Sequence, residues 1–378
     1  MTEQRPAGSN GKELARLFLK LGITAFGGPA AHIAMMQREV VEKRQWMDHQ
    51  HFLDLIGATN LIPGPNSTEM AIHIGHERGG WKGLLIAGIC FILPAVLITG
   101  LIAGLYQQYG HLPRVTQFIY GIKPAIIAII LAAALPLARR ALKTAELAVI
   151  GLLALGAALA GINEIYVMFG AGAVVLALYI IRNQGRARNL KSLTPFLLFN
   201  NSLFSPSNLK LFLIFLKIGA ILYGSGYVLF AFLDRELVAK GLLSRAQLVD
   251  AIAVGQFTPG PVFSSVTFIG WQINGWQGAA LATVAIFLPS FLFVALLNPL
   301  VPRMRRSALF AAFLDGVNVA SVAIIATVCI SFGRECLTGW RTILIALLSG
   351  MVTFGLPKVN TVWVVVGSGL LGYFLQLL

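Results

Sequence analysis

Two lysines lie inside apolar stretches at matched positions of the chain, Lys20 in the run FLKLG and Lys217 in the run FLKIG. A buried ammonium group is costly in hydrocarbon, so it is expected to face a cavity or an oppositely charged group. We therefore interpret both lysines as ligands of an anion or as gates. The alternative is that each side chain extends to the membrane interface. Lys123 is a weaker candidate, because the residue at its matched position is Asn318.

A Pro-Gly-Pro motif interrupts an apolar run twice, at residues 63–65 and 259–261. Proline cannot continue a helix, but it suits the first turn of a new one. The new helix leaves its first backbone amides without partners, and an anion at the helix N-terminus satisfies them. Two such ends near the middle of a membrane would surround a dianion. The alternative is a pair of ordinary proline kinks that neighbouring helices accommodate.

Glycine-rich motifs lie close to both lysines, FGGP at residues 26–29 and YGSG at residues 223–226. They predict unwound backbone, unless the glycines only allow helices to pack closely. With the proline breaks they complete the set of predicted substrate-binding residues. The set is Lys20, Lys217, Gly27, Gly28, Gly64, Asn66, Ser67, Thr68, Gly224, Ser225, Gly260, Ser264 and Ser265.

Three further charged residues have predicted roles. Glu69 follows the first Pro-Gly-Pro motif, and its counterpart is Ser265. We expect Glu69 either to accept a proton in a coupled transport cycle or to cap the new helix. Arg38 and Arg235 occupy matched amphipathic stretches, where they form an electropositive vestibule or, for either one alone, a plain surface charge.

The elements that position these residues must lie in a membrane. Apolar residues make up 57% of the 378 residues, charged residues only 12%, and the mean hydropathy is +0.78, which excludes a soluble globule. Apolar runs of about 20 residues, the length that crosses a bilayer, recur along the chain. Lys and Arg outnumber Asp and Glu by 29 to 15, and the excess lies in short loops, which fits membrane orientation better than nucleic-acid binding. The three cysteines are scattered and indicate neither disulfides nor a zinc site.

The sequence also repeats itself. The motifs FLKLG, RE at 38–39, PGP and GW at 80–81 return as FLKIG, RE at 235–236, PGP and GW at 275–276. This pattern predicts two homologous halves, residues 1–182 and 209–378, joined by a basic cytoplasmic linker at 183–208. Because basic loops follow the 115–138 run in the first half but precede its counterpart in the second, the halves are expected to insert in opposite orientations.

The predicted fold is therefore an all-α polytopic membrane protein built from two inverted-topology repeats. We expect about ten full spans, together with helices that are broken or re-entrant at the Pro-Gly-Pro motifs. The basic N-terminal arm fits this topology worst. If it stays inside, the first segment breaks at FGGP and another crossing is needed.

The stretches FLKLGITAFGGPAAH, NLIPGPNSTEMA, RGGWKG and ICFILPA resemble the chromate ion transporter family, in particular its long members with two fused halves. The resemblance covers essentially the entire chain. It implies export of chromate from the cytoplasm driven by the proton motive force, with sulfate as a competitor of similar shape. It also implies that the halves are oppositely oriented, because short members of the family work as such pairs. The second half departs from the pattern with YGSGY and TPGPVFSS, so the two half-sites are not expected to contact substrate equally.

Other functions remain open at this point. A passive anion channel and a transporter of sulfate or another oxyanion are the main alternatives. A membrane metallo-enzyme is weaker. Its basis is the helical spacing of Glu69, His73, His76 and Glu77, with the stretch DHQH at 48–51 nearby, and the second half does not repeat this cluster. We expect no enzymatic activity, cofactor, metal or nucleic-acid partner. The expected partners are the oxyanion and the lipid of a bacterial cytoplasmic (inner) membrane, with a homodimer left open.

Overall fold

The structure is a computed structural model that describes residues 11–110, 112–183, 207–224, 226–297, 304, 307–356 and 359–377. In these ranges the chain is helical and forms no β-strand. Five helical segments are long and apolar enough to cross a membrane. They are Asn66–Tyr109, Pro113–Ala141, Glu164–Arg182, Val262–Leu296 and Ala308–Cys336. The expected number of about ten full spans stays a prediction.

The first repeat begins with a helical hairpin made of α1 (Gly11–Thr24) and α2 (Pro29–Gln37), which continues into a π-helical turn, Arg38–Lys43. Helix α1 buries an apolar face that includes Leu14, Phe18 and Leu21. The tip of the hairpin is the FGGP motif, where the unwound glycines let the chain reverse and the proline starts the second helix.

A second hairpin follows, built from α3 (His49–Thr59) and the first part of α4 (Asn66–Tyr109), with Pro-Gly-Pro at its tip. Helix α4 is itself broken at Gly79 and Gly80, where the backbone leaves the helical conformation. It folds back there so tightly that a Cβ added to Gly75 would lie 2.4 Å from the carbonyl oxygen of Gly83. We call residues 66–78 the short arm of α4 and residues 81–109 its long arm. At about 1.5 Å per residue, the long arm alone exceeds the thickness of a bilayer.

The second repeat has the same order of elements. Helix α8 (Ser207–Ile221) is followed by α9 (Leu229–Leu233) with its π-helical turn, Asp234–Val238, and then by α10 (Arg245–Phe257). A short 3-10 turn, Val262–Ser264, leads into α11 (Ser265–Leu297). Helix α11 breaks at Asn274 and Gly275, which gives it a short arm, residues 265–273, and a long arm, residues 276–297.

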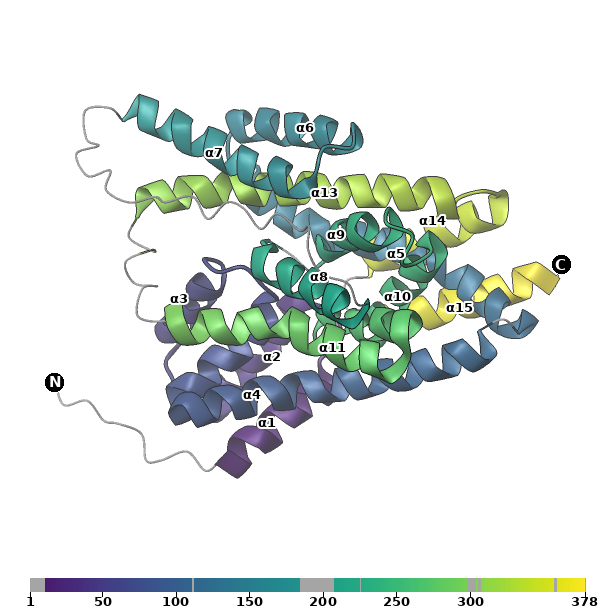
Figure 1. The fold of residues 1–378 in the computed structure, drawn as a ribbon, viewed down its shortest axis with the longest axis horizontal. Helices are drawn as coiled ribbons and strands as arrows, with labels where there is room; N and C mark the ends of the chain where they lie inside the picture. The colour runs from purple at the N-terminus through teal and green to yellow at the C-terminus, as the bar shows by residue number, and fades with distance from the viewer. Residues whose placement is uncertain are drawn as a thin grey trace.

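The two repeats enter the bundle from opposite ends, as the loop charges predict. The short arm of α11 runs beside the long arm of α4 in the same direction, because Thr267 lies against Gly100 and Trp271 against Gly104. The turn of α11 therefore lies near the last residues of α4, far from the turn of α4 itself, and Figure 1 shows the two helices side by side. We call the end of the bundle at Gly79–Gly80 face A and the end at Asn274–Gly275 face B.

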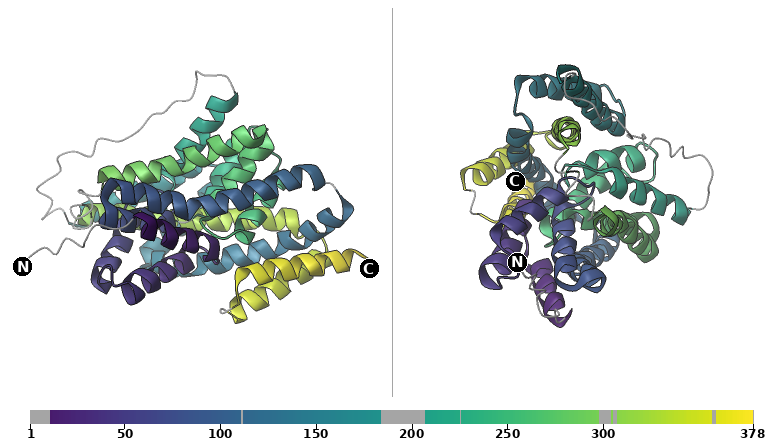
Figure 2. Two further views of the ribbon diagram at one scale, coloured as in Figure 1. Left: turned by 90° about the horizontal axis from the view of Figure 1, so that it is seen from below. Right: turned by 90° about the vertical axis from the view of Figure 1, so that its left-hand side faces the viewer.

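Three helices complete each repeat: α5 (Pro113–Ala141), α6 (Ala145–Leu159) and α7 (Glu164–Arg182) in the first, and α13 (Ala308–Cys336), α14 (Trp340–Gly355) and α15 (Thr361–Leu377) in the second. The last two helices of each repeat pack on the other repeat. Gly121 of α5 touches the backbone of Ser368 and Gly372 on α15, and Gly316 of α13 touches α7 in the same way. Figure 2 shows the two exchanged pairs, teal for α6–α7 and yellow-green to yellow for α14–α15, on separate sides of the bundle.

The predicted linker lies outside the described residues apart from Asn183, Ser207 and Asn208. At its far end, Asn208 forms a hydrogen bond with Asn274 at the turn of α11, so α8 starts on face B. The first residues of α1 lie on face A, where Glu13 pairs with Arg44 at 3.9 Å. The first segment folds back at FGGP, as expected for a chain that starts on face A. The additional crossing that this arrangement was expected to need stays a prediction.

Candidate functional site

Four hairpin tips, two from each repeat, meet inside the bundle. The backbone N–H of Gly64 donates to the carbonyl oxygen of Leu222 at 2.8 Å, and the N–H of Gly260 donates to the carbonyl oxygen of Ala25 at 2.8 Å. Each Pro-Gly-Pro tip is thus bonded to the glycine-rich tip of the other repeat, in a reciprocal pair of contacts. We call the meeting place, residues 25–28, 62–65, 222–224 and 258–261, the tip junction.

The predicted unwound backbone is confirmed at five of the six described glycines of these motifs, which have positive φ angles; the sixth, Gly226, does not. The angles are +98° at Gly27, +83° at Gly28, +139° at Gly64, +94° at Gly224 and +89° at Gly260. L-residues with side chains rarely adopt this region. The motifs therefore break the helices and do more than allow close packing. The predicted Ser225 lies outside the described residues.

Glu69 lies on the short arm of α4, fully buried beside the tip junction. A Cβ added to Gly64 would lie 2.1 Å from Glu69 Oε1 and 2.6 Å from Ser290 Oγ, so both side chains reach the Pro-Gly-Pro tip. Neither carboxylate oxygen of Glu69 has a hydrogen-bond partner among the described residues. A buried polar group without a partner needs an explanation, and a functional role is one of the usual ones.

The matching position in the second repeat carries no charge. There Gly260 approaches the methyl group of Ala95, 2.9 Å from an added Cβ, and the residue matched to Glu69 is Ser265. The tip junction is therefore symmetric in its backbone and asymmetric in its side chains. Among the described residues, the carboxylate at the junction belongs to the first repeat.

Buried hydroxyl groups surround the junction. Those of Thr68, Ser264 and Ser265 are without hydrogen-bond partners in the described part of the chain. Ser67 Oγ lies 3.2 Å from Nδ1 of His32, a buried side chain that the sequence did not single out. Asn66 is less buried and donates to Asn60 Oδ1 across its own tip at 2.8 Å. The predicted threonine and serines thus lie around one place, and the hydroxyl groups of Thr68, Ser264 and Ser265 are available to donate hydrogen bonds there. The side chain of Asn66 already donates to Asn60.

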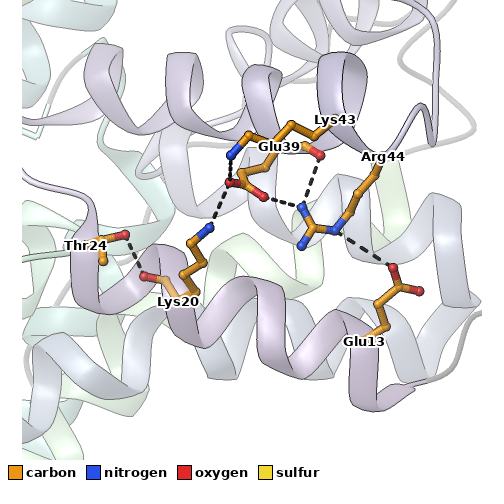
Figure 3. Close-up of polar contacts among 6 residues, drawn as sticks. All are labelled: Glu13, Lys20, Thr24, Glu39, Lys43 and Arg44. Atoms are coloured by element: carbon orange, nitrogen blue, oxygen red, sulfur yellow. Dashed lines mark hydrogen bonds and ion pairs between the residues drawn. The ribbon is translucent and has the colours of Figure 1, made fainter.

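The two predicted lysines lie outside the junction and bridge the arms of their own hairpins. Lys20 Nζ is 2.9 Å from Glu39 Oε1, and Lys217 Nζ is 2.8 Å from Glu236 Oε1. Lys43 also pairs with Glu39, and Figure 3 shows this cluster between α1 and the turn that follows α2. The oppositely charged partner that a membrane-embedded lysine needs is therefore a glutamate of the adjacent arm. A role as anion ligand stays a prediction for both.

The two predicted vestibule arginines differ in their surroundings. Arg235 donates to the carbonyl oxygen of Gly161 at 3.1 Å and lies 3.8 Å from Glu164, so it ties the second repeat to the start of α7. Arg38 opens the π-helical turn after α2, next to the buried Glu39. The vestibule stays a prediction.

A buried charge cluster joins α10 to the first repeat. Asp250 lies 3.0 Å from Lys123 Nζ of α5, and it accepts a hydrogen bond from the Tyr106 hydroxyl of α4 at 2.6 Å. Asp250 is only 7% exposed. Lys123 was a weak candidate in the sequence. Its partner Asp250 comes from the other repeat, and no local spacing indicates this pairing.

A cavity of about 230 Å³ opens on face A, lined by Trp46, Met47, Asp48, His51, Glu77 and Arg78. The guanidinium groups of Arg44 and Arg78 lie 5.8 Å and 5.1 Å from the Trp46 ring. The weak metal hypothesis finds no support here, since the described ranges contain no group of three or more His, Cys, Asp and Glu placed to hold a metal ion.

A family model described as chromate transporter matches residues 12–176 and again 209–373. A probable chromate transport protein of Synechococcus elongatus is 31% identical over 92% of this chain and 91% of its own length. Chromate transport proteins of Cupriavidus metallidurans and Pseudomonas aeruginosa are 29% and 28% identical, over 96% and 98% of this chain and 92% and 94% of their own lengths. No solved structure matches the chain.

Proposed function

Because the chain belongs to the chromate transporter family, we propose that it is a secondary transporter that exports chromate, or a similar tetrahedral oxyanion, driven by the proton motive force. Its site would be the tip junction. Chromate is proposed as the substrate because of the relatives named above, and the mechanism is proposed from the geometry of the junction.

The observation that carries the proposal is the meeting of four broken helices at one buried point. The short arm of α4 begins there, and its first amides, those of Asn66 and Ser67, donate to no backbone carbonyl among the described residues. An oxyanion could accept hydrogen bonds from such amides and from the hydroxyl groups of Thr68 and Ser264. Helix N-termini also carry partial positive charge, which favours an anion.

The proton would be carried by Glu69. An ionised carboxylate that is buried without a cation is costly in free energy. After the anion has left, the empty transporter therefore changes back to its cytoplasm-facing conformation at lower cost when Glu69 carries a proton. That return step couples the entry of a proton to the exit of an anion. The membrane potential adds to the drive, because moving a dianion outward is worth about 4.6 kcal/mol per 100 mV.

Face A is the cytoplasmic side in this proposal. Helix α5 ends on face A with Arg139 and Arg140, and the N-terminal residues of α1 lie on the same face. Basic residues concentrate in the cytoplasmic loops of membrane proteins. The proposed location is a bacterial cytoplasmic membrane, with face A toward the cytoplasm.

The test is uptake of labelled chromate by everted membrane vesicles, with sulfate, molybdate and phosphate as competitors. We expect uptake that an uncoupler abolishes and that sulfate reduces more than phosphate does. Replacing Glu69 by Gln should abolish gradient-driven accumulation but preserve exchange of chromate across the membrane. Glu146→Gln, which changes an exposed carboxylate paired with Arg182, is the control. Chromate uptake that is the same with and without the uncoupler would indicate a passive channel.

A further inference from the structure

The short arm of α4 carries ionisable side chains at Glu69, His73 and Glu77, with spacings of four residues. Side chains four residues apart on a helix are neighbours on one face, with about 6 Å between their Cβ atoms. Glu69 lies at the tip junction, and Glu77 lines the cavity on face A. This face of the arm therefore leads from the candidate binding site to the surface.

His73 occupies the middle of this line. It is 1% exposed, and neither ring nitrogen has a hydrogen-bond partner among the residues that the structure describes. A neutral imidazole has one nitrogen that accepts a proton and one that can release a proton. A buried histidine with both nitrogens unengaged is suited to relay protons between groups on its two sides.

The outer end of the line is open to water. The Glu77 side chain is 40% exposed, and its Oε2 lies 3.6 Å from His51 Nε2 of α3. Both residues line the cavity of about 230 Å³ on face A, together with Asp48 and Arg78. A proton that reaches Glu77 can therefore leave through this cavity.

The second repeat offers no counterpart. Its matching short arm, residues 265–273, reads SVTFIGWQI and contains no ionisable side chain. The line of ionisable groups is thus a property of the first repeat alone, on a backbone that both repeats share.

We infer that Glu69, His73 and Glu77 form a one-sided proton path between the tip junction and face A. The inference rests on the proposed function and adds to it the route by which Glu69 exchanges its proton. The proton leaves a carboxylate oxygen of Glu69 and binds one nitrogen of His73, whose other nitrogen releases a proton toward Glu77. The net charge of His73 is unchanged once the proton has passed.

Several other ionisable groups face this arm and belong to its electrostatic surroundings. They are His32 of α2, against Ser67; His51 of α3, against Glu77; Tyr223, which interacts with Glu69; and His76 and Arg78 of the arm itself. His76, three residues after His73, lies on the same side of the arm, whereas His32, His51 and Tyr223 belong to other elements.

The experiment compares two modes of transport in proteoliposomes. One is chromate accumulation driven by an imposed proton gradient, and the other is exchange of labelled for unlabelled chromate at equal pH, which needs no net proton movement. The variants are His73→Gln and His73→Phe, with His49→Gln, an exposed histidine of α3 away from the line, as the control. We expect both His73 variants to lose at least about tenfold in driven accumulation and to keep exchange within about twofold.

Each outcome decides one question. Driven accumulation at the wild-type level in both His73 variants would overturn the proton path. Loss of exchange in both would show that His73 is structural and would also overturn it. Wild-type liposomes that show neither mode would refute the proposed function itself, and wild-type exchange without driven accumulation would refute proton coupling and the path together.

Discussion

Gly64 is the residue at which the two repeats and the buried carboxylate come closest. Its amide bonds to Leu222 of the other repeat, and its α-carbon leaves no room beside Glu69 and Ser290. Its φ angle of +139° adds a conformational demand that only glycine meets without strain. Gly64 thus shapes the Pro-Gly-Pro tip, bonds to the other repeat and contacts the buried carboxylate of Glu69.

We therefore expect Gly64→Ala to abolish transport and to lower the thermal stability of the purified protein. The added Cβ would displace Glu69 and Ser290, and overpacking of this kind typically costs about 1–3 kcal/mol. Measurement of chromate uptake and of Tm in detergent tests this. Gly170→Ala is the control, since Gly170 has no atom within 4 Å of an added Cβ. Wild-type uptake in Gly64→Ala would contradict the tight junction described here.

Among individual residues, the sequence predicted the unwound glycines and an oppositely charged group or a cavity beside each lysine, but it did not identify which residue is the partner. Lys20 pairs with Glu39, and Lys217 pairs with Glu236, in each case 19 residues later in the chain. The equal spacing was visible in the repeat, because both glutamates belong to the matched RE motifs. The pairing itself could not be predicted, since it requires each hairpin to fold back at its glycines.

At the scale of elements, the apolar runs predicted helices and breaks but not how the chain turns at them. A run such as the one that contains Gly79 and Gly80 is long enough for a single crossing or for a sharp hairpin, and hydrophobic periodicity does not distinguish the two. Close backbone contact between Gly75 and Gly83 makes the hairpin possible, and the same contact recurs between Gly270 and Gly278. Each repeat contributes two other hairpin tips to the junction, one at its Pro-Gly-Pro motif and one at its glycine-rich motif, and the sequence predicted a break at both.

The contact of α10 with α4 and α5 gives a prediction at this scale. Asp250→Asn or Lys123→Met leaves a partly or fully buried charge without its partner, and breaking such a pair costs roughly 3–5 kcal/mol. We expect the double variant to lose much less stability than the sum of the single variants, as measured by denaturant unfolding in detergent. The exposed pair Lys143–Asp315 is the matched control, with a coupling below about 1 kcal/mol. Additive losses at Asp250 and Lys123 would show that the cluster is not a unit.

At the scale of the whole molecule, the loop charges predicted the inversion because membrane insertion imposes a rule that short loops obey. The exchange of the outer helices could not be predicted in this way. It depends on close backbone contact, as between Gly121 and Gly372 or between Gly316 and Gly172. A glycine in an apolar helix does not indicate which of its neighbours it will face.

The exchange predicts that the repeats can assemble from separate chains. We expect residues 1–182 and 207–378, expressed together with a tag on one, to co-purify, and each alone to be degraded because its outer pair lacks the helix on which it packs. Gly121→Leu in the first chain should prevent co-purification, since an added Cβ would lie 2.1 Å from the carbonyl oxygen of Ser368. Two chains that each fold stably alone would argue against the exchanged packing.

The reciprocal bonds at the junction use only main-chain atoms, from Gly64 to Leu222 and from Gly260 to Ala25. Such bonds set no requirement on the side chains around them beyond the glycines themselves. After an ancestral duplication, either copy could thus change its flanking residues while the joint between the copies stayed intact. The two copies could therefore diverge to FGGP and YGSG without losing their assembly. One copy alone could likewise retain or gain a carboxylate. In this way a homodimeric ancestor could give rise to a protein whose two halves have different roles.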